Sequence, residues 1–174
     1  MIDFSTIDYL KNGSLKQVQA FEVLTQHKFL SKMAPYDPIL AGTIPINIAI
    51  DNSDLDILCY WEDKAAFIAM LEFHFTKEHQ FILRETVIDA HETVIANFRI
   101  ENFEIEIFGQ NIPVRNQNGY LHLLIEHEIL ESKEESFRLE IIKLKQKGYK
   151  TEPAFALLLG LKGNPYEVLL KYKM

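Results

Sequence analysis

Two aspartates, Asp54 and Asp56, are the residues of this chain whose type and spacing best suit chemistry. One residue separates them at the start of an apolar stretch, so in a β-strand both side chains project from one face with Cα atoms ~7 Å apart. Two ionised carboxylates with oxygens ~5 Å apart repel each other by ~3 kcal/mol at an effective dielectric constant of about 20. Such a pair favours a bound cation, and oxygen ligands with open coordination positions suit Mg²⁺.

A Gly-Thr pair precedes these aspartates. Gly42 and Thr43 follow the short apolar run 39–41, and ten residues separate them from Asp54. A glycine at the end of a strand lets the backbone approach a phosphate closely, while Thr43 adds a hydroxyl and a backbone N–H. We therefore expect this pair to bind phosphate groups beside a metal held by the aspartates.

The whole segment resembles the signature of the nucleotidyltransferase superfamily, which includes antibiotic-modifying and minimal nucleotidyltransferases. That signature is Gly followed by Ser or Gly, a short spacer, and an Asp-hydrophobic-Asp-hydrophobic sequence. Gly42-Thr43, the spacer and the Ser-Asp-Leu-Asp-Ile run 53–57 match it, with Thr43 in place of the commoner Ser. The runs 105–110 and 150–155 are similar to a small bacterial family of unknown function that itself resembles nucleotidyltransferases. The resemblance covers most of the chain.

The resemblance implies a third carboxylate on a later strand that faces the first two. Apolar and acidic residues alternate over 103–108, so Glu104 and Glu106 share one face. We select Glu106 because it lies deeper in the strand, next to a break predicted at Gly109. The expected metal ligands are Asp54, Asp56 and Glu106, with Glu104 as the other acidic candidate, and the expected nucleotide-binding residues are Gly42, Thr43 and Ser53. An edge strand with a solvated acidic face is the alternative explanation of the alternation.

The resemblance also implies a reaction. A protein of this superfamily would use Mg²⁺ (or Mn²⁺) to transfer a nucleoside monophosphate from a nucleoside triphosphate to a hydroxyl acceptor, by two-metal phosphoryl chemistry. The acceptor, a small molecule or a protein, is not identified by the sequence. One alternative is an inactive member that binds a nucleotide or a protein partner. Another is an unrelated α+β domain, in which the three carboxylates would not converge.

Charge and composition restrict the partners. The formal net charge is −7 and the isoelectric point about 5.4. Because phosphate neutralisation supplies much of the affinity for nucleic acids, an acidic chain argues against a long nucleic-acid substrate and against anionic membrane surfaces. The first residues lack the regions of a signal peptide, and no apolar run approaches the ~20 residues that span a bilayer. We expect a cytoplasmic protein, and a homo-oligomer is compatible with the sequence.

The order of predicted elements indicates an α+β fold. Strands are expected at 39–41, 54–61, 81–88, 93–100 and 103–108, the last ended by Gly109. Helices are expected at 15–24 after a Ser14 cap, at 65–75, at 117–131, after a capping box at 132–135, after a Thr151 cap and after Asn164-Pro165. We predict a nucleotidyltransferase-like mixed β-sheet with flanking helices over residues 1–115, and a C-terminal helical segment over 116–174 packed on it.

Other polar residues are weaker candidates. His122 and Glu126 are four residues apart on a predicted helix and share a face, as a metal-ligand pair would, but we expect a solvent-facing polar pair. Three arginines could clamp a triphosphate with their planar donor groups: Arg84, Arg99 and Arg115. The single cysteine, Cys59, lies among apolar residues, so we predict a buried and unreactive thiol.

Overall fold

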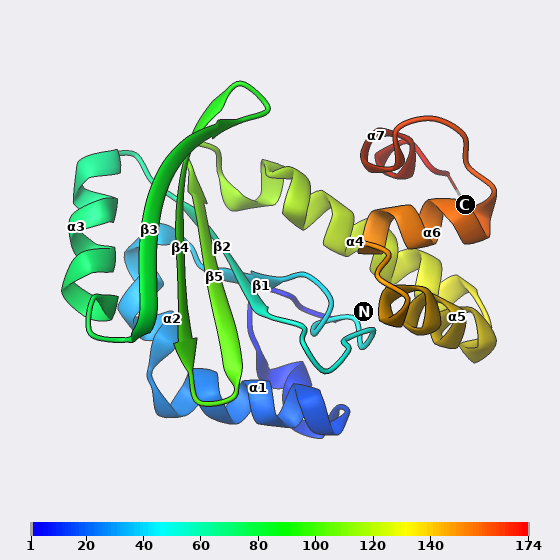
Figure 1. The fold of residues 1–174 in the computed structure, drawn as a ribbon, viewed down its shortest axis with the longest axis horizontal. Coiled ribbons are helices and arrows are strands. Elements are labelled where there is room, and N and C mark those ends of the chain that lie inside the picture. The colour runs from blue at the N-terminus through cyan, green and yellow to red at the C-terminus, as the bar shows by residue number, and fades with distance from the viewer. Residues whose placement is uncertain (1, 174) are drawn as a thin grey trace.

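The computed structural model describes residues 2–173, in which a mixed β-sheet is flanked by helices (Figure 1). The five strands of the sheet lie in the order β1-β2-β5-β4-β3. Their bounds are β1 Ile39–Ala41, β2 Leu55–Tyr60, β3 His79–Ile88, β4 His91–Ile100 and β5 Phe103–Gln110. Strands β2 and β5 run parallel, and the other neighbouring pairs are antiparallel. The predicted α+β class with a mixed sheet is confirmed.

Strand β5 continues through Gly109, where the sequence predicted its end. Gly109 is the Cα partner of Cys59 on β2 and of Val94 on β4. A Cβ atom at Gly109 would lie 2.3 Å from Cε1 of Phe67 and 3.0 Å from Cδ1 of Trp61. Glycine is required here because a helix packs closely on the strand, so the prediction of a break was wrong.

The N-terminal helices and α3 cover one face of the sheet (Figure 1). The helices of this layer are the 3₁₀ turns η1 Asp8–Asn12 and η2 Ala34–Tyr36 and the α-helices α1 Leu15–Gln26, α2 Phe29–Met33 and α3 Lys64–Phe75. Alternate residues of β2, namely Leu55, Ile57 and Cys59, are fully buried against this layer. Because side chains alternate along a strand, Asp56 and Leu58 project from the opposite face.

A C-terminal helical segment packs on that opposite face. It contains η3 Val114–Asn116, α4 Asn118–Ser132, α5 Glu135–Gln146, α6 Thr151–Leu159 and α7 Pro165–Leu170. A second hydrophobic cluster joins Ile39 of β1 and Leu58 of β2 to Leu123 of α4 and Phe155 of α6. In Figure 1, α5, α6 and α7 gather around α4 beside the sheet. Within residues 2–173, no helix has both the length and the apolar composition needed to cross a membrane.

Two helix starts differ from the prediction. Ser132 is the last residue of α4, and its hydroxyl donates to the Ile129 carbonyl at 2.8 Å, so it does not cap α5. The N-cap of α5 is Glu134. Thr151 is the first residue of α6, whose N-cap is Lys150. Ser132 thus belongs to the end of the preceding helix, and Thr151 lies one residue inside the helix that it was expected to cap.

Two other helix starts agree with the prediction. Ser14 is the N-cap of α1, and its N–H donates to Oε1 of Gln17 at 2.9 Å. Asn164 is the N-cap of α7, and its side chain accepts a hydrogen bond from the Tyr166 N–H at 3.1 Å. Each contact satisfies a backbone donor that a helix terminus leaves without an intrahelical partner.

Candidate metal and nucleotide site

Asp56 and Glu106 lie opposite each other in the middle of the sheet. Asp56 on β2 is the Cα partner of Glu106 on β5, and neighbouring strands are ~4.8 Å apart. Both side chains project towards the helical segment, because the alternate residues of both strands fill the core on the other face. Asp54 is partly buried and lies two residues before Asp56, immediately before β2. The charges of Asp54 and Glu106 both act on Asp56, but within residues 2–173 the three carboxylates do not converge to within 4.8 Å of one another.

Glu106 and Glu104 have different surroundings. Glu106 accepts a hydrogen bond from Nδ2 of Asn97 at 3.1 Å, and Nη2 of Arg84 lies 3.8 Å from its carboxylate. Glu104 is exposed, and its carboxylate lies 3.3 Å from Nη1 of Arg99. Two of the arginines considered as phosphate clamps therefore contact the acidic face of β5. Glu106 is the glutamate that lies directly across from Asp56.

Gly42 lies against the carboxylate of Asp56. Ala41, the last residue of β1, is the Cα partner of Asp56, and the chain turns at Gly42 with φ of +72°. A Cβ atom at Gly42 would lie 2.0 Å from Oδ2 of Asp56. Glycine is required for two reasons, since it tolerates the left-handed backbone conformation and leaves room for the carboxylate.

The loop 43–53 is closed by its own polar side chains. The hydroxyl of Thr43 donates to Oγ of Ser53 at 3.2 Å, and this oxygen also accepts the N–H of Ile50 at 2.9 Å. Thr43 follows Gly42 directly, and Ser53 directly precedes Asp54. The hydrogen bond between Thr43 and Ser53 therefore holds the predicted phosphate-binding residues at the aspartates.

Burial and repulsion between carboxylates disfavour the ionised form of Asp56. Burial, the largest cause, and the neighbouring charges of Asp54 and Glu106 raise the pKa of Asp56 to about 8. Lys145 opposes this shift. A cation placed beside these carboxylates would lower the pKa of Asp56 and stabilise its charged form.

Lys145 of α5 is a buried cation that the sequence analysis missed. Its side chain is only 8 % exposed, and burial lowers the pKa of its ammonium group to about 8. The carboxylates that favour its charged form include those of Glu126 and Asp56. Lys143, two residues earlier on α5, is exposed. The lysines of α5 alternate with apolar residues, so nothing in their local spacing distinguishes the buried one.

The prediction that His122 and Glu126 form a solvent-facing pair was wrong. His122 is 7 % exposed and Glu126 is 3 % exposed. Glu152 of α6 lies beside them, and the ring of Tyr166 on α7 has its centroid 6.3 Å from that of His122. Helices α6 and α7 cover this face of α4, and such packing between distant segments cannot be seen in helical spacing alone.

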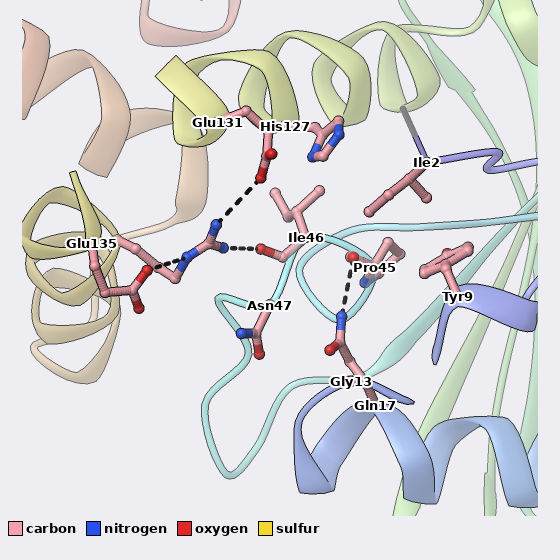
Figure 2. Close-up of a pocket in the computed structure, with 11 residues that line it drawn as sticks. Ile2, Tyr9, Gly13, Gln17, Pro45, Ile46, Asn47, His127, Glu131 and Glu135 are labelled. Atoms are coloured by element: carbon pink, nitrogen blue, oxygen red, sulfur yellow. Dashed lines mark hydrogen bonds and ion pairs between the residues drawn. The ribbon is translucent and has the colours of Figure 1, made fainter. Parts of the chain in front are cut away.

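A pocket of about 340 Å³ lies between the loop 43–53 and helices α4 and α5, and none of the three carboxylates lines it (Figure 2). The guanidinium group of Arg138 donates to the Ile46 carbonyl and contacts the carboxylates of Glu135 at 3.2 Å and Glu131 at 3.9 Å (Figure 2). Because these partners occupy Arg138, the pocket is poorly suited to a phosphate group. The contact of Arg138 with the Ile46 carbonyl instead holds α5 against the loop 43–53.

The excess of negative charge around Asp56 would be reduced by a divalent cation. Asp56 and Glu106 face each other across a parallel strand pair, and the raised pKa of Asp56 reflects a local excess of negative charge. The missing side chain at Gly42 leaves the Asp56 carboxylate unobstructed on that side. Oxygen-only ligands suit Mg²⁺ or Mn²⁺. Asp54, Asp56 and Glu106 are the residues that would hold such an ion.

Comparison with known proteins gives a family but no curated relative. The model of a family described as "Domain of unknown function (DUF4269)" matches residues 22–172. This range contains the Gly-Thr pair, both aspartates and the entire helical segment apart from its last residues. No curated protein matches the chain.

Solved nucleotidyltransferases share the fold. A structure of Cid1, which has RNA terminal uridylyl transferase activity, superimposes with a TM-score of 0.53 at 12% identity over 75% of this chain and 40% of that chain. The GLD-2/RNP-8 complex superimposes with a TM-score of 0.53 at 11% identity, over 87% of this chain and 57% of that chain. Cid1 poly(U) polymerase with MgGTP bound superimposes with a TM-score of 0.52 at 13% identity, over 79% of this chain and 42% of that chain. The chain thus has a nucleotidyltransferase-like α+β fold and spans 40% to 57% of the length of these chains.

Proposed function

The chain belongs to the DUF4269 family, and we propose that it is a Mg²⁺- or Mn²⁺-dependent nucleotidyltransferase. It would transfer a nucleoside monophosphate from a nucleoside triphosphate to a hydroxyl acceptor. The acceptor oxygen would form a bond to the α-phosphorus as the bond to pyrophosphate breaks, and the hydroxyl proton would pass to solvent water. The observation that carries this proposal is the position of Asp56 opposite Glu106, with Asp54 beside them and Gly42 against the Asp56 carboxylate.

Each predicted site residue has a role in this proposal. Asp54, Asp56 and Glu106 would bind the metal, which when bound neutralises charge on the triphosphate and on the leaving pyrophosphate. Asn97 of β4, on the other side of Glu106 from Asp56, donates a hydrogen bond to the Glu106 carboxylate. Gly42, Thr43 and Ser53 would bind the phosphates through backbone N–H groups and hydroxyls at the closed ends of the loop 43–53.

Lys145 extends the site into the helical segment. Its ammonium group faces the carboxylates of Asp54 and Asp56 from α5, and within residues 2–173 no carboxylate lies within ion-pair distance of it. A triphosphate bound near Asp56 would give this cation a partner of opposite charge. We assign Lys145 to phosphate binding, and the helical segment 116–174 to the wall of the acceptor site.

A nucleotide-binding protein without transferase activity is the second candidate. The observation that favours it is the contact between Glu106 and Arg84, at 3.8 Å, because an arginine already neutralises part of the charge that a metal would need. In this alternative the fold and the triphosphate site persist, and a nucleotide or a protein partner is bound without turnover. Release of pyrophosphate separates the two candidates.

The first experiment is thermal unfolding with each nucleoside triphosphate, with and without Mg²⁺ or Mn²⁺. A ligand at 100 times its dissociation constant should add about 2.7 kcal/mol to the free energy of unfolding. A metal-dependent shift that is lost in Asp56→Asn supports the site. Incubation with an α-phosphate-labelled triphosphate and pools of hydroxylated small molecules or proteins then tests transfer. Metal-dependent binding without pyrophosphate release favours the second candidate. No binding of any triphosphate contradicts the transferase and restricts the second candidate to binding a protein partner.

A further inference from the structure

A second group of metal-ligating side chains lies between α4 and α6. One ring nitrogen of His122 and one carboxylate oxygen from each of Glu126 and Glu152 lie within 4.8 Å of one another. His122 and Glu126 are four residues apart on α4 and share its covered face, and Glu152 comes from the first turn of α6. The group therefore combines two ligands from one helix with a third from a helix that packs against it.

The polar atoms of this group lack partners. Neither Nδ1 of His122 nor Oε1 of Glu126 has a hydrogen-bond partner among residues 2–173, although both atoms are fully buried. Leaving a buried carboxylate or imidazole without a partner costs free energy, so native structures almost always satisfy such groups. Three side chains that converge without bonding to one another are arranged around a shared point, as the ligands of one ion are.

Lys145 does not account for the arrangement. Its single positive charge is near four carboxylates, those of Glu126, Asp56, Asp54 and Glu152. Within residues 2–173, no ion pair joins Lys145 to any of the four. With a neutral imidazole and both glutamates ionised, the two glutamates and the lysine leave a net charge of −1, before the aspartates are counted. A divalent cation would reduce that imbalance.

We infer that His122, Glu126 and Glu152 form a binding site for Zn²⁺ that is separate from the carboxylates around Asp56. An imidazole nitrogen with two carboxylates is a ligand set that favours Zn²⁺ over Mg²⁺, which takes oxygen ligands. Three protein ligands leave a fourth position of a tetrahedral ion open. Three such ligand atoms lie about 3.3 Å apart around zinc, so the side chains need to move inward only slightly.

This site would join two helices of the acceptor wall. Glu126 and His122 are on α4, and Glu152 is on α6, so a bound ion would tie these helices together beside Lys145. Because metal binding to a folded site adds its free energy to folding, Zn²⁺ should raise the unfolding temperature of the chain. This readout needs neither a nucleotide nor an acceptor, so it does not depend on the proposed transferase activity.

The test is a titration of the untagged, chelator-treated protein with Zn²⁺ by calorimetry, together with thermal unfolding. The wild-type chain should bind one Zn²⁺ at this site, and His122→Gln and Glu152→Gln should each weaken that binding by about tenfold or more. Asp56→Asn should keep it. Glu128→Gln, at an exposed position of the same helix α4, is the matched control and should also keep it.

Glu152 is only partly buried, so its variant tests the site even if His122→Gln fails to fold. Three results would overturn the inference. The first is the absence of stoichiometric Zn²⁺ binding by the wild-type chain. The second is binding that Glu152→Gln retains at full affinity. The third is binding that Asp56→Asn abolishes while Glu152→Gln does not, which would assign the ion to the nucleotide site.

Discussion

Asp56 and Glu106 are Cα partners in the parallel pair of β2 and β5, and their carboxylates face the same side of the sheet. Neighbouring strands hold the two backbones ~4.8 Å apart, so the two residues cannot separate without breaking the sheet. Asp54 adds a third negative charge, and Lys145 is the buried cation that opposes it. This arrangement concentrates negative charge at a position that a metal ion would stabilise.

The first prediction concerns these carboxylates. Asp56→Asn and Glu106→Gln should each weaken Mg²⁺-dependent triphosphate binding by about tenfold or more, because each removes a charged metal ligand. Asp51→Asn, at an exposed position of the loop 43–53, is the control and should bind triphosphates as the wild type does. Calorimetric titration with each triphosphate in Mg²⁺ measures the effect. Wild-type affinity in both site variants would contradict the metal site.

The second prediction is a pH dependence of stability without metal. The pKa of Asp56 is raised from 3.8 to about 8 in the folded chain, so the folded state binds this proton more tightly than the unfolded state. The contribution of protonated Asp56 to the free energy of unfolding is therefore fully present below about pH 4 and is lost as the pH rises towards about 8. Each pKa unit corresponds to about 1.4 kcal/mol, so Asp56→Asn should become more stable than the wild type by a few kcal/mol at pH 8.

Urea unfolding in EDTA at pH 5 and pH 8 measures this difference. The advantage of Asp56→Asn over the wild type should be larger at pH 8 than at pH 5, since the Asn side chain carries no charge at either pH. Saturating Mg²⁺ should stabilise the wild type more than the variant. A pH-independent difference between the two proteins would mean that Asp56 has an ordinary pKa.

The third prediction compares two glycines with similar backbone angles. Gly42 has φ of +72° and would place a Cβ 2.0 Å from Oδ2 of Asp56, whereas Gly160 has φ of +68° and no atom of the described chain within 4 Å of its Cβ position. Alanine should cost about 1–2 kcal/mol at either position through backbone strain alone. Only Gly42→Ala should also weaken triphosphate binding, because it displaces the Asp56 carboxylate. Equal binding by both variants would exclude a role for that contact.

The fourth prediction concerns Lys145. Lys145→Met should weaken the binding of all four triphosphates by a similar factor, about tenfold, because a charge-assisted contact to phosphate is independent of the base. Lys143→Met is the control, because Lys143 is exposed and its ammonium group pairs with Glu140 on the same helix. The measurement is the dissociation constant of each of the four nucleoside triphosphates for the wild type and both variants. A loss confined to one base would place Lys145 at the base instead of the phosphates.

The sequence alone determined those features that depend on residues close together in the chain. The alternation of Asp54, Leu55, Asp56 and Ile57 predicts that Leu55 and Ile57 lie in the core, and both are fully buried. The same alternation predicts the buried Cys59, which is fully buried. Local periodicity is sufficient for these features, because a strand directs successive side chains to opposite faces whatever packs against it.

Only the tertiary structure decided which distant residues meet. Strand register places Glu106, and not Glu104, across from Asp56, and the turn at Gly42 brings a position with no side chain against the same carboxylate. The packing of α5 and α6 buries Lys145 and covers the face of α4 that carries His122. Burial and charge proximity depend on contacts between segments far apart in the chain, so residue spacing within one helix or strand carries no information about them.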